Sequence, residues 1–373
     1  MTLTLAAFRF AMWAVGASAA HDSVARRQGV EPAANAIVDA RYAGPDGARV
    51  AGLPTYRTLN AALRDAPGGA PSPWTIRLRA GRYREKVSID KPNIQLVGAH
   101  RDSTVITWAD AAGFPDRGGG TLGTRGSWTV RATVADFHAT HLTIENAFDF
   151  GANARKADTD TSKLQGTQGV ALALTDRSDR VVLSDVALLG HQDTFFANAG
   201  RAYVRGSRIV GNVDFIFGNA RMVIDSTDIV SLDRGNPNNN GYIAAPSTDV
   251  STYGFLFLRS RLLKERPAMA AGSVALGRPW HPSADPRAIG QAVFVDCWMD
   301  NHISAEGWDR MSSTVSVGGD RIWFEPSAAR FFEYRSTGPG AQRSPTRRQL
   351  SDGDARSYTP ALVLDGWSPE VWR

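Results

Sequence analysis

The chain has 373 residues, of which 43% are apolar and 21% charged, a composition typical of a packed globular protein and not of a disordered one. Its formal charge of +5 and pI of about 9.5 would suit a polyanionic partner, which could be nucleic acid, an anionic lipid surface or an acidic polysaccharide. The single cysteine, Cys297, excludes an intrachain disulfide and a cysteine-based zinc site.

The N-terminal residues 1–20 are interpreted as a signal peptide. An apolar stretch, Phe10–Ala20, ends in the sequence Ala-Ser-Ala-Ala, which resembles a signal-peptidase site. Only Arg9 supplies an early positive charge, so the signal is atypical. The stretch is too short to cross a bilayer as a helix of the mature protein. We therefore expect secretion and no membrane association.

One short helix is predicted at Thr58–Asp65, where Leu59, Ala62 and Leu63 have helical spacing. Beyond it, short β-rich runs dominate, each bounded by Gly, Asn or Asp. They read WTIRL, NIQLVG, VVLSDVALLG, YVRGSRIVG, MVIDSTDIV, FLFLRSRLL and AVFVDCWMD. This pattern predicts an all-β protein. No linker or change of composition marks a second domain, so residues 35–373 are expected to form one domain.

A loose repeat runs through these segments. Its mark is a small residue followed two positions later by an apolar one, at Asp185/Ala187, Ser207/Ile209, Thr227/Ile229, Ser260/Leu262 and Cys297/Met299. The first two intervals are nearly equal, whereas the later two are longer and fit a coil with a loop insertion. Thr140/Leu142 lies about two coils earlier. The repeat favours a parallel β-helix of stacked coils, with a β-sandwich with irregular loops as the alternative.

Polar residues recur at the same interval. Gln192 and Asp193 follow Gln168 by about one coil, and Asp214 follows Asp193 by about one coil more. In stacked coils such residues lie roughly 4.8 Å apart. Two carboxylates at that separation do not both ionise readily, so their pKa values split into a base or nucleophile and an acid. Arg278, in LGRPW, is a candidate cation for the ionised partner, and the amides could stabilise an oxyanion.

The motifs QDTFF, VDFIFG and LGRPW resemble the signature motifs of the pectinesterases (pectin methylesterases). GRYREKV, GYIAAPST and FFEYRSTGPGA extend the resemblance, which covers about residues 40 to 367. MDNHI followed by GWDRM is most similar to the bacterial branch of the family. The resemblance implies a single-stranded, right-handed, pectin-lyase-like parallel β-helix with a short N-terminal helix and long loops that form a cleft.

The resemblance also implies hydrolysis of the methyl esters of polygalacturonate to methanol and pectate. Asp214 would be the nucleophile and Asp193 the general acid and then base. Gln192 and Gln168 would form the oxyanion hole, and Arg278 would hold Asp214 ionised. Residues implied to contact substrate are Phe217, Trp280 and Met311 in the sugar groove, with Thr124, Val213, Arg234, Tyr242 and Ser283 as further subsite residues. Neither a metal ion nor a cofactor is required.

Two residues depart from the usual family pattern: Gly169 follows the first glutamine, and Phe195 stands where leucine is common. Both affect the expected fit of subsites and remove no reacting group. The expected partner is methyl-esterified pectin bound by a monomer, and not nucleic acid, since Lys and Arg occur at most in pairs along the chain.

Two other functions are considered. A polysaccharide lyase would show a calcium-binding acid cluster, and an inverting glycosidase would place its carboxylates farther apart. A non-catalytic β-helix that binds cell-wall polysaccharide is the alternative from a different class.

Overall fold

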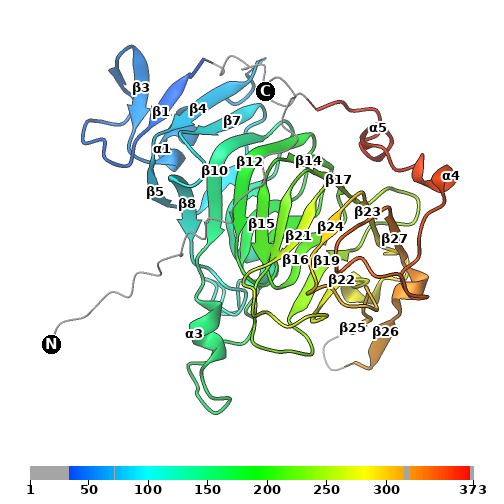
Figure 1. The fold of residues 1–373 in the computed structure, drawn as a ribbon. Helices are drawn as coiled ribbons and strands as arrows, with labels where there is room; N and C mark the ends of the chain where they lie inside the picture. The colour runs from blue at the N-terminus through cyan, green and yellow to red at the C-terminus, as the bar shows by residue number, and fades with distance from the viewer. Residues whose placement is uncertain (1–32, 71, 315–318, 370–373) are drawn as a thin grey trace. The chain divides into compact units, whose positions relative to one another are not determined.

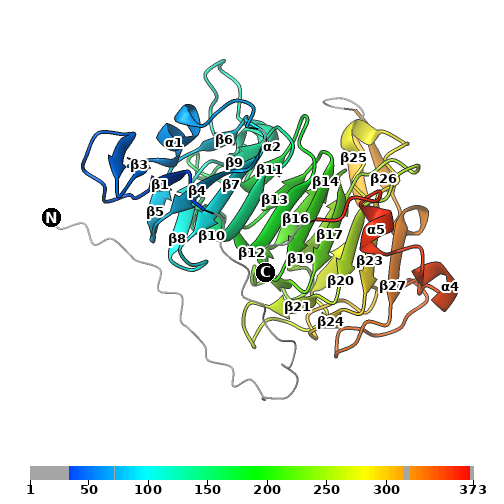
Figure 2. The ribbon, with the colours of Figure 1, turned by 90° about the horizontal axis from the view of Figure 1, so that it is seen from above.

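The chain winds into a right-handed parallel β-helix in which each coil contributes strands to three faces (Figures 1 and 2). The computed structural model describes residues 33–70, 72–314 and 319–369. Strands of successive coils pair in parallel, which confirms the expected fold class and removes the β-sandwich alternative. The interpreted signal peptide, residues 1–20, lies outside the described residues, and the domain limits of 35–373 stay a prediction.

The first face consists of β6 (Val87–Ile89), β9 (Trp128–Ala132), β11 (Val170–Leu174), β13 (Phe195–Ala197), β16 (Val213–Gly218), β19 (Gly241–Pro246) and β22 (Val274–Gly277). The second consists of β4 (Trp74–Leu78), β7 (Ile94–Gly98), β10 (His138–Asn146), β12 (Val181–Leu189), β14 (Arg201–Arg205), β17 (Arg221–Asp225), β20 (Phe255–Leu258), β23 (Gln291–Val295) and β27 (Arg330–Tyr334). The third consists of β5 (Gly81–Arg84), β8 (Thr104–Trp108), β15 (Arg208–Gly211), β18 (Asp228–Ser231), β21 (Arg261–Lys264) and β24 (Trp298–Met299), together with the second halves of β10 and β12.

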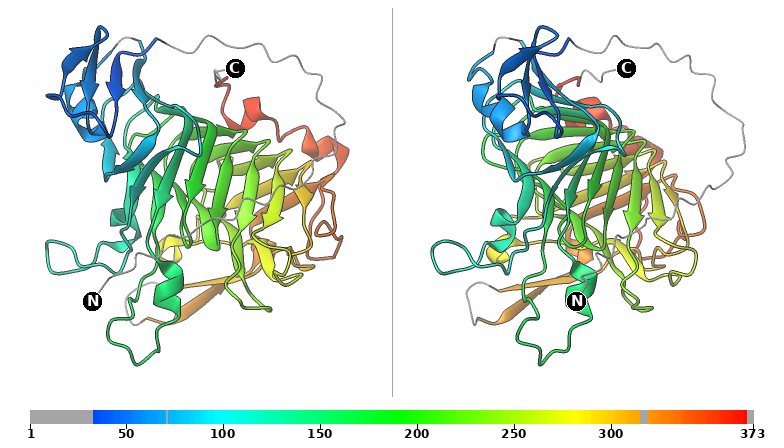
Figure 3. Two further views of the ribbon diagram at one scale, coloured as in Figure 1. Left: turned by 60° about the vertical axis from the view of Figure 1, so that its left-hand side comes forward. Right: turned by 90° about the vertical axis from the view of Figure 1, so that its left-hand side faces the viewer.

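The remaining elements lie at the ends and in the loops. At the N-terminal end they are β1 (Ala36–Val38), β2 (Ala48–Val50), β3 (Leu53–Tyr56) and α1 (Leu59–Asp65). The loops hold α2 (Gly123–Gly126), α3 (Phe150–Ala154), η1 (Pro282–Ala284), η2 (Pro326–Ala328) and the antiparallel hairpin of β25 (Met311–Thr314) and β26 (Arg321–Phe324). The C-terminal segment carries α4 (Asp352–Ala355) and α5 (Pro360–Val363). The loops with α3 and with β25 and β26 project on the same side of the β-helix (Figures 1 and 3).

A column of left-handed residues makes the bend between the second and third faces. β10 bends at His141 and β12 at Asp185, where φ is 54° and 53°. The corresponding residues of the later coils have φ between 49° and 56° and are Gly206, Ser226, Arg259, Asp296 and Arg335. A left-handed residue turns the chain sharply between two extended segments. The β-rich runs after β12 are therefore each two strands, such as β17 and β18 in MVIDSTDIV.

The small residues of the sequence repeat form a ladder of buried hydroxyls next to this bend. Ser207 Oγ accepts a hydrogen bond from Val186 N (3.1 Å), Thr227 Oγ1 from Ser207 N (3.3 Å), and Ser260 Oγ from Thr227 N (3.2 Å). Each hydroxyl thus satisfies a buried amide of the preceding coil. Cys297 continues the ladder and is fully buried, with its Sγ 3.5 Å from Phe257 O.

In the first two coils, the sequence repeat predicts a strand register that differs by one position from the observed pairing. Ile209 pairs with Leu188 and not with Ala187, and Leu188 in turn pairs with Ile144. The expected pairing of Leu142 is therefore also shifted, since Leu142 lies opposite Val186. The physical reason is that Asp185 occupies the bend itself and is not part of the hydroxyl ladder.

Helix α1 confirms the one predicted helix. Thr58 caps it, because its Oγ1 accepts from Ala61 N (3.2 Å), and the Glu85 carboxylate accepts from Leu59 N (2.7 Å). Leu59 and Leu63 are buried in the core that fills the coils. Among the described residues, no helix has the length and apolar character needed to cross a membrane.

Candidate active site

An apolar strip covers part of the outer surface of the first face. It consists of Phe196 and Phe217, whose rings stack with centroids 4.5 Å apart, and of Trp280, 5.6 Å from Phe217. Trp128 packs against the same cluster from β9. Strand alternation places these rings outside because their sequence neighbours, such as Phe195 and Ile216, fill the interior. Phe217 and Trp280, both predicted groove residues, therefore lie side by side.

Asp214 and Arg278 form a bidentate ion pair beside this strip. Arg278 Nε donates to Asp214 Oδ1 (2.8 Å) and Nη2 to Oδ2 (2.6 Å). The guanidinium also lies over the ring of Tyr242, 3.9 Å from its centroid. Asp214 is only 6% exposed, so the arginine provides the compensation that a buried carboxylate requires. The expected contact between these two side chains is confirmed.

The backbone conformation at Asp214 orients its carboxylate toward Arg278. Its φ is 48°, and the pairing of β16 with β19 shifts register between Val213 and Ile216. Such an irregularity breaks the simple alternation of a strand and redirects one side chain, and aspartate tolerates the left-handed conformation better than most residues. This explains how an acid within the apolar run VDFIFG reaches Arg278.

Asp193 lies one coil before Asp214. Phe195 pairs with Ile216, and the same sequence offset relates Asp193 to Asp214, while Asp193 N donates to Val213 O (3.0 Å). Burial, and secondly the charge of Asp214, raise the pKa of Asp193 well above its ordinary 3.8. Arg278 and a hydrogen bond from Thr124 oppose that rise. The second carboxyl is thus arranged to hold a proton next to the arginine-paired first one.

The two glutamines precede neighbouring strands of the first face. Gln168 lies just before β11 and Gln192 just before Asp193, and both are half-buried. Thr167 Oγ1 donates to Gln192 Oε1 (3.0 Å), so the Gln192 NH₂ group is left to donate elsewhere. Gly169 N donates to Gln192 O (3.0 Å), which ties the two coils together. Thr167 was missed because a hydroxyl beside a glutamine carries no distinctive sequence signal.

The two departures from the family pattern have structural explanations. A Cβ on Gly169 would lie 2.8 Å from Asn146 Oδ1, and Asn146 is fixed by hydrogen bonds to the carbonyls of Asp110 and Ser127 (both 2.9 Å). Phe195 is fully buried in the interior core, so it does not contact the cleft, and the doubt about subsite fit at this position is wrong.

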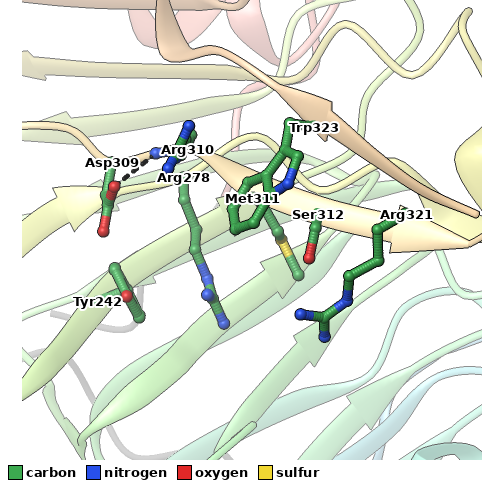
Figure 4. A pocket seen from close by; sticks show the side chains of 8 residues that line it. All are labelled: Tyr242, Arg278, Asp309, Arg310, Met311, Ser312, Arg321 and Trp323. Atoms are coloured by element: carbon green, nitrogen blue, oxygen red, sulfur yellow. Dashed lines mark hydrogen bonds between the residues drawn. The ribbon is translucent and has the colours of Figure 1, made fainter.

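The other predicted substrate-binding residues divide into two groups. Tyr242 and Met311 line a pocket together with Arg278 (Figure 4). Arg234 is exposed, and partial desolvation with the nearby charge of Arg278 lowers the pKa of its guanidinium. Val213 is 9% exposed, immediately before Asp214.

Thr124 and Ser283 lie elsewhere in the site. Thr124 in α2 hydrogen-bonds Asp193, and its role as a subsite residue stays a prediction. Ser283 lies in η1 at φ 51°, and the neighbouring Ala284 N donates to Ser313 of β25 (3.2 Å). Among the described residues, no group of three or more His, Cys, Asp or Glu side chains is placed to hold a metal ion.

A model of the pectinesterase family matches residues 49–366. The chain belongs to the pectinesterase family. Its relatives include pectinesterase A of Dickeya dadantii, 43% identical over 329 residues that cover 85% of this chain and 89% of the relative. The resemblance inferred from the motifs of this pectinesterase-family chain is therefore confirmed.

Solved pectin methylesterases have the same fold as this family member. That of Erwinia chrysanthemi is 41% identical, with a TM-score of 0.85 over 91% of this chain and 100% of the other. That of Yersinia enterocolitica is 44% identical, with a TM-score of 0.80 over 84% of this chain and 100% of the other. A pectin methylesterase in complex with a hexasaccharide also matches, with a TM-score of 0.85 at 41% identity over 91% of this chain and 100% of the other.

Proposed function

We propose that this chain is a carboxylic ester hydrolase that removes methyl groups from the galacturonate residues of pectin, releasing methanol and pectate. Family membership and the relatives named pectinesterase support the reaction, and the relative bound to a hexasaccharide supports a carbohydrate polymer as substrate. The observation that carries the proposal is the buried, arginine-paired Asp214 one coil from Asp193, a buried carboxyl whose pKa burial raises well above its ordinary value.

In the first step, a carboxylate oxygen of Asp214 attacks the carbonyl carbon of the methyl ester. The amides of Gln168 and Gln192 donate to the oxyanion of the tetrahedral intermediate. The intermediate collapses by breaking the bond to the methoxy oxygen, which takes the proton of Asp193 and leaves as methanol. The product is an acyl-enzyme anhydride at Asp214 and an ionised Asp193.

In the second step, water attacks the acyl carbon of the anhydride. Asp193, now ionised, takes a proton from this water, and the second tetrahedral intermediate releases the Asp214 carboxylate. The galacturonate product forms as a carboxylic acid and loses its proton to solvent, and Asp193 ends protonated as it began. Arg278 stabilises Asp214 in its ionised form before attack and after release.

Asp214→Ala tests the assignment of the nucleophile. We expect methanol release from highly esterified pectin to fall at least about a thousandfold, because the attacking group is removed. Asp228→Ala is the matched control, since Asp228 also pairs bidentately with an arginine, Arg261 (2.7 and 2.8 Å), but on the third face. The control should retain activity. Near wild-type methanol release by Asp214→Ala would refute the mechanism.

Polymer viscosity distinguishes the alternative enzymes. An esterase releases methanol without shortening the polymer, so the viscosity of a pectin solution should stay constant while methanol accumulates. A lyase or glycosidase would lower the viscosity, and a non-catalytic binding protein would release no methanol. Secretion, guided by residues 1–20, and action as a monomer on pectin, with no nucleic-acid or membrane partner, are further parts of this proposal.

A further inference from the structure

A polar contact outside the machinery described above joins the two catalytic coils. His191 immediately precedes Gln192, and Asn212 lies two positions before Asp214. Asn212 N donates to His191 O (3.0 Å), and the side-chain atoms Asn212 Nδ2 and His191 Nδ1 lie 3.4 Å apart. Asn212 is only 1% exposed. Neither residue has a role in the mechanism above, although each lies close in sequence to a residue that has one.

The backbone next to Asn212 decides which end of its side-chain amide faces the histidine. Val213 N can only donate, and it donates to Asn212 Oδ1 (2.8 Å). The NH₂ group of Asn212 therefore faces His191, and an NH₂ group can only donate. His191 Nδ1 must accept from it, so the neutral imidazole carries its proton on Nε2. In the imidazolium both ring nitrogens are donors, and this hydrogen bond is lost.

The surroundings of His191 favour the neutral ring. The half-buried imidazole stacks on Phe150 of α3, with ring centroids 5.1 Å apart and planes 13° from parallel. Burial lowers the pKa of His191 below its ordinary 6.5, and the charge of Asp149, the N-cap residue of α3, opposes that shift. From the next coil, the ring meets the uncharged amide of Asn212. His191 Nδ1 is therefore an acceptor at neutral pH and becomes a donor only in acid.

We propose that His191 is a positioning residue whose neutral imidazole holds Asn212. The contact fixes Gln192 of one coil relative to Asp214 of the next, and this inference rests on the proposed function. The oxyanion donor and the nucleophile belong to different coils, and an error of about 1 Å in their relative placement can cost about a hundredfold in rate. Protonation of His191 breaks its hydrogen bond to Asn212 and loosens this placement. The rate of ester hydrolysis therefore falls as the pH drops through the pKa of His191.

Two substitutions of His191 separate the hydrogen bond from the ring packing. His191→Phe keeps a ring that stacks on Phe150 but removes the acceptor, so kcat on highly esterified pectin should fall about ten- to a hundredfold with little change in KM. His191→Asn places an amide oxygen near the position of Nδ1 and does not titrate. It should retain more of kcat than His191→Phe, and its kcat should persist to lower pH than that of the wild type. His100→Phe is the matched control and should keep the wild-type kcat, since His100 is exposed and its Nδ1 also accepts a hydrogen bond, from Asp102 N (3.2 Å).

The nitrogen chemical shifts of the His191 imidazole, measured by NMR in the whole protein, report the tautomer without turnover. A neutral ring with an unprotonated Nδ1, which titrates below the ordinary 6.5, supports the proposal. A ring protonated at Nδ1 at neutral pH overturns it, and so does an unshifted pH dependence of kcat in His191→Asn. A wild type that releases no methanol would refute the proposed function and the inference with it. An active wild type together with an equally active His191→Phe would refute the positioning role alone.

Discussion

Two aspartates on successive coils are buried to a similar extent but have different partners. Asp214 receives both parallel hydrogen bonds of Arg278. Within the described part of the chain, Asp193 has no cation of its own and is balanced only by a hydrogen bond from Thr124 and the charge of Arg278. The asymmetry assigns the roles, because a buried acid without a counter-ion keeps its proton whereas a paired one loses it.

Because burial raises the pKa of Asp193, this residue should make the protein less stable as the pH rises from the unfolded pKa of the carboxyl to its higher folded pKa. A carboxyl whose pKa is raised on folding contributes most below the unfolded value, and the contribution is lost as pH rises through the raised folded pKa. Asp193→Asn should match the wild type near pH 3.8 and have the higher Tm at neutral and alkaline pH, while it releases methanol far more slowly.

Thermal unfolding of both proteins across this pH range is the measurement. Asparagine is a suitable replacement because it accepts the φ of 65° at this position. A variant that is less stable than the wild type by the same amount at every pH would show that the carboxyl is not held protonated by burial.

At the scale of elements, buried side-chain hydroxyls hold the coils in register in addition to the hydrogen bonds between strands. The ladder Ser207, Thr227 and Ser260 satisfies one backbone amide per coil at the bend, where a left-handed residue interrupts the strand pairing. Each hydroxyl is also a donor, as Thr227 Oγ1 is to Asp225 O (3.0 Å). The small residues of the sequence repeat are therefore explained by their hydrogen bonds to the backbone as well as by packing.

Thr227→Val should destabilise the fold without affecting catalysis. The substitution conserves shape but leaves Ser207 N and Asp225 O without this buried partner, which costs about 1–3 kcal/mol of the free energy of unfolding. Denaturant unfolding should show this loss, with kcat on pectin unchanged. Thr227→Ser keeps the hydroxyl and should lose less than Thr227→Val. Equal losses in both variants would assign the effect to the methyl group instead.

At the scale of the whole molecule, the C-terminal segment covers the outer surface of the second face. Val363 and Leu364 of the α5 region are buried there against Tyr203, Val223 and Leu256 from three successive strands. Arg221 of β17 adds an ion pair to Asp365 (3.0 Å). The segment therefore shields apolar positions that would otherwise face solvent.

Removal of residues 351–373 should lower Tm and cause aggregation on heating, because this apolar patch becomes exposed. Light scattering during a thermal scan is the measurement. The double variant Val363→Ser/Leu364→Ser in the full chain should show the same effect in weaker form. A truncated protein that unfolds like the wild type and stays soluble would mean that the segment does not stabilise the β-helix.

Much of the site could be predicted because few residues separate equivalent positions of successive coils, so residues that are close in sequence are also stacked in space. The interval between Asp193 and Asp214 equals the pairing offset of β13 and β16, in which Phe195 lies opposite Ile216. The predicted register is wrong by one position at Ala187 because the bend at Asp185 is a backbone conformation, which residues as different as Gly206, Ser226 and Arg259 adopt in later coils. Residue type alone does not locate it.

The sequence by itself determined the stacked β coils, the column of two glutamines and two aspartates, and the family to which they belong. These features depend on strand alternation and a near-constant coil length, both of which are local. Only the tertiary structure decided the bidentate geometry by which Arg278 pairs with Asp214, the hydrogen bond of Thr124 to Asp193 and the place of Arg321 in the pocket lining. The sequence offset between paired strands is longer for β19 and β22 than for β13 and β16, because loops are inserted between the later coils. The length of such a loop does not specify where the chain returns to the β-helix.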